Sequence, residues 1–142
     1  MLRAILIFLF GDPRSILFSR VLSAILSMCP CAQNEGADAC AALRQRAAVA
    51  ITVVAIGDAD PEDAAGKLIG LGAHETGFRT EVQRLDHGRK GPAVSFFQVE
   101  VRRSERAAML ADPVRAARHA LRVARSCRHL DTYAGRPCGS GS

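Results

Sequence analysis

Residues 112–125 carry the pattern that most constrains the fold. Asp112 is a good helix-capping residue, and Pro113 suits the first helical position. After them, apolar residues recur at the three- and four-residue spacing of an α-helix, and arginines recur at the same spacing one position later. The apolar set is Val114, Ala117, Leu121 and Ala124, and the basic set is Arg115, Arg118, Arg122 and Arg125. This segment is therefore predicted to be an amphipathic helix.

Two further helices are predicted upstream. Residues 38–56 have the composition of a buried helix, because they are rich in alanine and in large aliphatic side chains. Asp60 then caps a second helix, which has Pro61 at its first position. This helix is expected to end near Glu75, with Gly77 as its terminator.

The remaining segments complete a mainly α prediction. Residues 78–91 are polar, as in a loop or a small hairpin, and residues 92–101 leave strand and helix both open. A chain of 142 residues, 49% hydrophobic, is long enough to bury one core. We expect one small helical domain over residues 38–138, with an irregular loop or short hairpin around residues 78–100. A flexible tail, 139–142, follows it.

Residues 1–31 form a separate apolar segment. Two apolar runs, 4–10 and 16–26, are split by Gly11-Asp12-Pro13-Arg14, which argues against one spanning helix. A basic start followed by an apolar run is typical of a signal peptide, yet no small-residue cleavage site follows cleanly. A signal peptide, a membrane anchor and a misassigned start with Met28 as the first residue all stay open.

The cysteines and the charge bear on compartment and partners. Cys29 and Cys31 lack zinc-motif spacing, and neither a metal nor a cofactor is expected. Cys127 and Cys138 flank a turn-rich stretch; a disulfide between them suits an exported domain, and two reduced thiols suit a cytosolic one.

The charge is uneven along the chain. Residues 1–78 hold six basic and eight acidic side chains, whereas residues 79–142 hold thirteen and six. Such a basic half favours an anionic partner: nucleic acid, a membrane or a cell-wall polymer. Nucleic acid is the weaker prediction, because one Tyr and no Trp leave little surface for base stacking.

Glu75 is the candidate for acid–base chemistry. It stands at the end of an apolar helix, where the chain turns into a polar loop. An apolar wall and the negative end of a helix dipole both raise the pKa of a carboxyl group, which suits a general acid. The neighbouring His74 does not indicate zinc, because the second His of the His-Glu-x-x-His motif is missing.

The segment His74-Glu75-Thr76-Gly77-Phe78 resembles the Glu-Ser-x-Phe signature of lysozyme-like lytic transglycosylases, in the superfamily of goose-type lysozyme. About twenty residues later that family has a Gly-led apolar turn ending in Gln, and Ser95-Phe96-Phe97-Gln98, after Gly91, is similar to it. Tyr133-Ala134-Gly135 resembles the third motif. Three departures stand out: Thr76 replaces Ser, Ser95 replaces Gly, and no Asn follows Tyr133.

This resemblance covers roughly residues 40–138 and implies a lytic transglycosylase that degrades bacterial peptidoglycan, of bacterial or phage origin. It implies Glu75 as the single catalytic acid and base, and a monomer in the cell envelope, the periplasm or secreted. The residues implied to line the sugar groove are Thr76, Phe97, Gln98 and Tyr133. Two alternatives remain: a hydrolytic muramidase with Asp86 as second carboxylate, and a non-enzymatic basic module that binds an anionic polymer.

Overall fold

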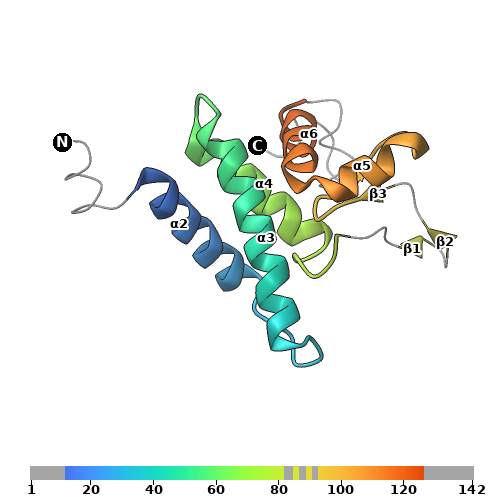
Figure 1. Cartoon of the computed structure of the whole chain (residues 1–142), viewed down its shortest axis with the longest axis horizontal. Helices are drawn as coiled ribbons and strands as arrows, with labels where there is room; N and C mark the ends of the chain where they lie inside the picture. The colour runs from blue at the N-terminus through green and yellow to red at the C-terminus, as the bar shows by residue number, and fades with distance from the viewer. Residues whose placement is uncertain (1–11, 82–84, 87–88, 91–92, 127–142) are drawn as a thin grey trace, which may run out of the picture.

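The computed structural model describes residues 12–81, 85–86, 89–90 and 93–126. Over these residues the chain forms five α-helices, a short 3-10 helix and two antiparallel hairpins of two strands each (Figure 1). The helices are α2 (Pro13–Met28), α3 (Ala37–Ile56), α4 (Pro61–Glu75), α5 (Arg106–Ala111) and α6 (Pro113–Arg125), with the 3-10 helix η1 at Arg103–Glu105. The strands are β1 (Leu85–Asp86), β2 (Arg89–Lys90), β3 (Ala93–Val94) and β4 (Val99–Glu100). The prediction of a mainly α domain with a short hairpin is confirmed.

Three helices begin with the same Asp-Pro pair. The carboxylates of Asp12, Asp60 and Asp112 accept hydrogen bonds from backbone N–H groups of the first turns of α2, α4 and α6, at 3.0, 3.1 and 3.1 Å. The proline that follows each of them has no N–H to leave unsatisfied. The predicted starts at Asp60 and Asp112 are therefore confirmed, and the segment around Asp12, expected only as a break between apolar runs, begins a helix.

The helix α3 lies at the centre of the domain and packs against α2, α4 and α6 (Figure 1). Small side chains let these helices approach one another closely, and buried alanines line their contacts. They include Ala47, Ala48 and Ala55 on α3, Ala64 on α4, and Ala116, Ala117 and Ala120 on α6. Within the described residues, α3 alone is long and apolar enough to cross a membrane by length and composition, and half of the qualifying stretch is buried inside the structure.

The expectation that α3 is buried throughout is wrong for part of its surface. Val49, Val53 and Ile56 are 50%, 45% and 37% exposed, although composition had assigned them to the core. Their spacing of four and three residues places them on one face of the helix. This apolar face is not covered by the described residues.

The described residues between 78 and 101 form two short hairpins and no helix. Leu85 pairs with Lys90 in the first hairpin, and Val94 pairs with Val99 in the second. The expected loop or small hairpin is thus confirmed, and within residues 92–101 the described part is a hairpin with two-residue strands around the turn Ser95–Gln98. The helix α5 had no counterpart in the prediction, because its six residues are too few to show a helical period.

Candidate active site

Glu75 is the last residue of α4, and its side chain is half-buried. The helix ends there because the N–H groups of Thr76 and Gly77 both donate to the carbonyl of Gly72, at 3.0 and 2.9 Å. Gly77 has a φ of 62°, the left-handed conformation that glycine adopts without strain. The predicted terminator is therefore confirmed, and the carboxyl group lies at the carbonyl end of the helix.

The hydroxyl group of Thr76 fastens this helix end to the second hairpin. Its Oγ1 donates a hydrogen bond of 2.8 Å to the carbonyl of Phe96 and accepts one of 3.2 Å from the N–H of Phe78. The two joined segments lie twenty positions apart in the sequence. They are the same two segments that resemble the first and second motifs of the family.

Three phenylalanine rings pack beneath the helix end. Phe78, Phe96 and Phe97 are all buried, with ring centroids 5.9 to 6.4 Å apart. Gly72 makes room for this cluster, because a Cβ atom at that position would lie 2.2 Å from the ring of Phe78. The sequence around Glu75 therefore folds against an aromatic core, which fixes where α4 stops.

The turn Ser95–Gln98 is held by its own side chains. The Oγ of Ser95 accepts from the N–H of Phe97 at 3.1 Å, and Nε2 of Gln98 donates to the carbonyl of Ser95 at 2.8 Å. Ser95 has a φ of 75° and Gln98 one of 47°. A positive φ is uncommon for residues other than glycine, so Ser95 occupies a position where glycine would be unstrained. That is the position at which the similar family motif begins with Gly.

The predicted groove residues have different surroundings. Thr76 is half-buried at the helix end, as described above. Phe97 is fully buried, which corrects the prediction that it lines an open sugar groove: its ring packs in the core instead. Gln98 is only 7% exposed and its amide bonds back to its own turn. Asp86 belongs to β1, but its side chain lies outside the described part of the structure, and so does the whole of Tyr133.

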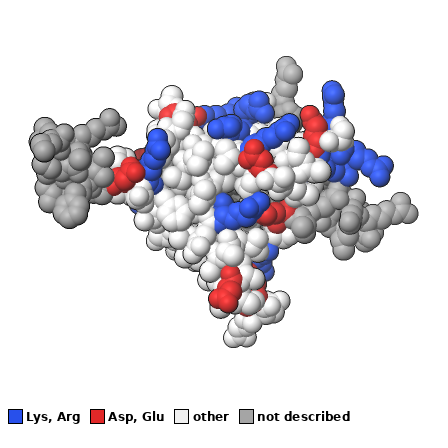
Figure 2. Space-filling view, in the orientation of Figure 1, with Lys and Arg blue, Asp and Glu red and all other residues white. Residues whose placement is uncertain are grey.

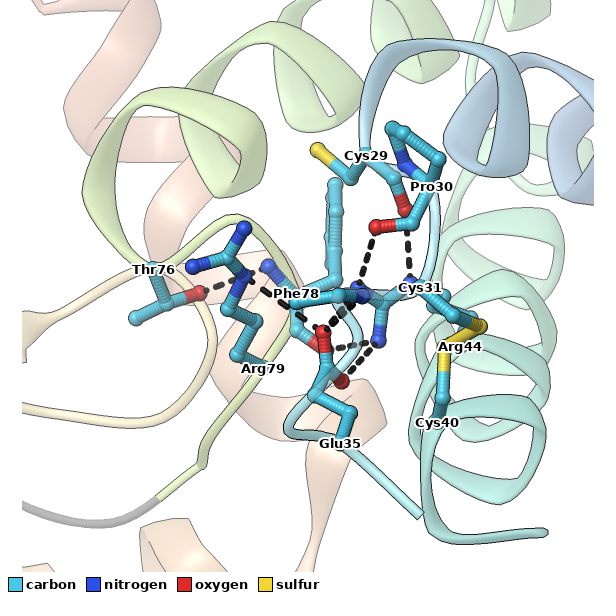
Figure 3. Close-up of polar contacts among 10 residues, drawn as sticks. Cys29, Pro30, Cys31, Glu35, Cys40, Arg44, Thr76, Phe78 and Arg79 are labelled. Atoms are coloured by element: carbon cyan, nitrogen blue, oxygen red, sulfur yellow. Dashed lines mark hydrogen bonds and ion pairs between the residues drawn. A yellow bond between two sulfur atoms is a disulfide. The ribbon is translucent and has the colours of Figure 1, made fainter. Parts of the chain in front are cut away.

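Arg44 forms a buried polar centre next to the site (Figure 3). Its guanidinium group donates to both carboxylate oxygens of Glu35, at 2.9 and 3.0 Å. It also donates to the carbonyl of Cys29 at 2.8 Å and, at 3.4 Å, to those of Pro30 and Phe78. The hydrogen bonds from Arg44 to Glu35 are the largest cause that lowers the pKa of Glu35 below its usual range, and the bond from the N–H of Ala32 is the second. Arg44 thus ties the chain after Glu75 to the chain after α2.

A disulfide between Cys31 and Cys40 closes the loop that carries Glu35 (Figure 3). The two Cα atoms lie 5.8 Å apart, a usual separation for this bond. Cys29 is a free, buried thiol, and burial raises its pKa. The predicted pair Cys127 and Cys138 lies outside the described residues.

The sequence interpretation missed both the Arg44–Glu35 pair and this disulfide. A signal for the first was present, since Arg44 interrupts an alanine-rich helix and Glu35 precedes it by nine positions. A lone charge in a helix that is otherwise buried needs a partner, because burying it unpaired is costly. Comparisons of the chain with protein-family models, curated proteins and solved structures find no match.

Proposed function

We propose that this protein is a peptidoglycan lytic transglycosylase in which Glu75 is the catalytic acid and base. One observation carries the proposal: the hydrogen bond from Thr76 to the carbonyl of Phe96. It joins the helix end that bears Glu75 to the turn that ends in Gln98. In the sequence these two segments resemble consecutive motifs of the family, and a shared site requires them to be neighbours.

The positive φ of Ser95 is a second observation that supports the proposal of a lytic transglycosylase. A turn that begins with glycine in the family is expected to need that conformation, and Ser95 adopts it here. The departure from Gly to Ser is therefore one of side chain, and the shape of the turn is kept.

The chemistry begins with a protonated Glu75. Its carboxyl group donates the proton to the glycosidic oxygen between N-acetylmuramic acid and N-acetylglucosamine, and the bond from that oxygen to C1 of the muramic acid breaks. The N-acetyl group of the substrate assists at C1. The Glu75 carboxylate then removes the proton of the C6 hydroxyl, whose oxygen closes on C1 to give a 1,6-anhydro ring. One carboxyl group is enough, because no water has to be activated.

The disulfide supports an oxidising compartment for the protein. Disulfides such as Cys31–Cys40 persist in oxidising compartments, including the periplasm and the outside of the cell. Peptidoglycan lies in the same compartments. The disulfide therefore supports the cell envelope as the compartment that we propose, and we propose that the protein acts there as a monomer.

The test is digestion of purified sacculi, with the released muropeptides read by mass. The wild type is expected to leave 1,6-anhydromuramic ends, which lack one water. Glu75→Gln is expected to lower the rate by at least about a hundredfold, because the amide cannot donate the proton. Glu62→Gln is the matched control: this carboxylate lies in the first turn of the same helix, with a side chain 78% exposed.

Each other result has a definite meaning. Reducing ends instead of anhydro ends assign the protein as a hydrolytic muramidase and make Asp86 the residue to replace next. Equal activity of Glu75→Gln and Glu62→Gln removes Glu75 from the mechanism. No muropeptides at all, together with retention on DNA at moderate salt, favours the basic binding module.

A further inference from the structure

An apolar surface lies near the C-terminal end of α3, the end away from Cys40 and its disulfide. Val49, Val53 and Ile56 share one face of α3 and are each between about a third and a half exposed. They line one side of a cavity of about 480 Å³ between α2 and α3, with Arg14 and Phe18 of α2 opposite. Exposed aliphatic side chains grouped in this way mark an interaction surface.

A basic surface adjoins it. A second cavity, of about 430 Å³, lies between the end of α3 and α6, and it shares Val53 and Gly57 with the first. Its other wall carries the arginines that sequence analysis placed on one face of α6. Basic side chains gather over α6 in Figure 2, next to the largely uncharged surface over α2 and α3.

Three of these arginines keep their charge available. Arg125 is neutralised by Asp58 and Asp63, with N–O distances of 2.6 to 2.9 Å. Within the described part of the chain, however, no carboxylate pairs with the exposed side chains of Arg115, Arg118 and Arg122. We call these three residues, together with Val49, Val53 and Ile56, the apolar–basic face.

We propose that the apolar–basic face binds the surface of an anionic phospholipid bilayer. Aliphatic side chains insert at the level of the acyl chains while arginines pair with lipid phosphates, so a surface that offers both matches this partner. Nucleic acid would use the arginines alone and would leave the exposed valines and isoleucine in water.

The position of the N-terminal apolar run supports the same partner. Residues 4–10 precede Asp12, the cap of α2, by two positions, and Arg14 in the first turn of α2 lines the first cavity. The run is therefore close in the sequence to a helix whose first turn lines this cavity. Stable membrane attachment takes two signals, and a chain with both an apolar segment and a basic surface has two such signals.

Binding of a bilayer by the apolar–basic face also bears on the position of Glu75, and this step rests on the proposed function. The helix α4 begins next to the end of α3 and runs away from it for 15 residues, about 20 Å (Figure 1). Glu75 therefore lies at the end of α4 that is farther from Ile56 and Gly57, which line the first cavity.

The test measures binding of the full chain to sedimented vesicles. One vesicle contains phosphatidylcholine alone, and the other contains equal parts of phosphatidylcholine and phosphatidylglycerol. Arg118→Gln/Arg122→Gln is expected to bind the anionic vesicle about tenfold or more weakly than the wild type. Arg102→Gln/Arg103→Gln, which removes the same charge from exposed positions outside both cavities, is the matched control and is expected to bind normally.

A second variant tests the apolar part. Val49→Ser/Val53→Ser keeps every charge and is expected to weaken binding to the anionic vesicle as well, with helix content checked by circular dichroism. Equal binding by this variant and the wild type overturns the proposal, as does equal loss by the two arginine pairs. Retention on duplex DNA through Arg118 and Arg122, without vesicle binding, overturns it in favour of nucleic acid.

Vesicle binding and wall lysis are independent readouts. Glu75→Gln is expected to bind vesicles like the wild type, so a failure of lysis leaves the docking result intact. Failure of docking, in turn, leaves the digestion of purified sacculi unaffected, because that assay contains no bilayer.

Discussion

Replacing Arg44 with methionine is expected to lower the free energy of unfolding by about 3–5 kcal/mol. The side chain has no exposed surface, and its guanidinium group serves Glu35 and three backbone carbonyls at once. Methionine fills a similar length but donates no hydrogen bond. The substitution therefore leaves the carbonyl of Cys29, bonded at 2.8 Å, without its partner in a buried place.

The magnitude follows from these contacts. A buried carbonyl left without a partner costs about 1–3 kcal/mol. The bonds to Pro30 and Phe78, at 3.4 Å, are longer and contribute less each. The charged pair with Glu35 is only part-buried, and its loss adds to the cost of the lost carbonyl bonds, which together come to about 3–5 kcal/mol. This loss is a large share of the free energy of unfolding of an ordinary domain, which is about 5–15 kcal/mol.

Urea unfolding followed by far-ultraviolet circular dichroism measures the effect. Tryptophan fluorescence is not an option, because the chain has no Trp. With a typical slope for a small domain, the midpoint is expected to fall by about 2 M urea. Arg46→Met is the control: it lies two positions along the same helix, is 45% exposed and pairs with Glu81 at the surface. Its expected cost is below about 1 kcal/mol.

Equal losses of stability in Arg44→Met and Arg46→Met would contradict a structural role for Arg44, as would a loss below about 1 kcal/mol in Arg44→Met. Either result would mean that the carbonyl groups find water or that the loop between Cys31 and Cys40 rearranges at little cost. A midpoint that falls only when the disulfide is reduced would point to the second explanation.

Two further predictions concern the helix end and the acid limit of stability. Thr76→Val is expected to lower the free energy of unfolding by about 1–3 kcal/mol and also to lower the rate of sacculus digestion, because the hydrogen bond to Phe96 is lost. Thr76→Ser keeps the hydroxyl group and is expected to keep most of the stability and most of the digestion rate. Equal urea midpoints for the two variants would contradict this prediction. Hydrogen bonds from Arg125 lower the pKa of Asp58 from 3.8 to about 2. The folded state thus binds that proton less readily than the unfolded chain, so this stabilisation is present above pH 3.8 and is lost as the pH falls toward 2. Urea midpoints measured down this range should fall less steeply for Asp58→Asn, and an unchanged slope would contradict the assignment.

The helix starts at Asp60 and Asp112 could be predicted from sequence because their signals are local. An aspartate followed by proline caps a helix through atoms only a few positions apart, so Asp60 and Asp112 were sufficient by themselves. Composition was insufficient to predict which side chains of α3 are buried, because a count of apolar residues does not say which face of a helix is covered by a neighbouring helix. Val49 and Ile51 look alike in the sequence, yet one is half exposed and the other fully buried.

In the candidate site, too, the local features could be predicted from the sequence and the features that depend on packing could not. That Glu75 ends a helix follows from Gly77 and from the helical pattern before it, and the structure agrees. The hydrogen bond between Thr76 and the carbonyl of Phe96 depends on how the second hairpin packs, which no local pattern states. Phe97 beside Gln98 fits a groove wall and a core equally well by composition, and only the packing against Phe78 decides for the core.

The turn after Glu75 is held from two sides by residues that have no part in the proposed chemistry. On one side Thr76 binds the carbonyl of Phe96, and on the other Arg44 binds the carbonyl of Phe78. A general acid needs a fixed place relative to the oxygen that it protonates, because small displacements cost much of the rate. These two contacts hold the turn that follows Glu75, next to the hydrogen bonds and aromatic packing that end the helix. Glu35, which lies forty positions before Glu75, therefore acts on the site through Arg44, by keeping a buried charge where it can hold a carbonyl group.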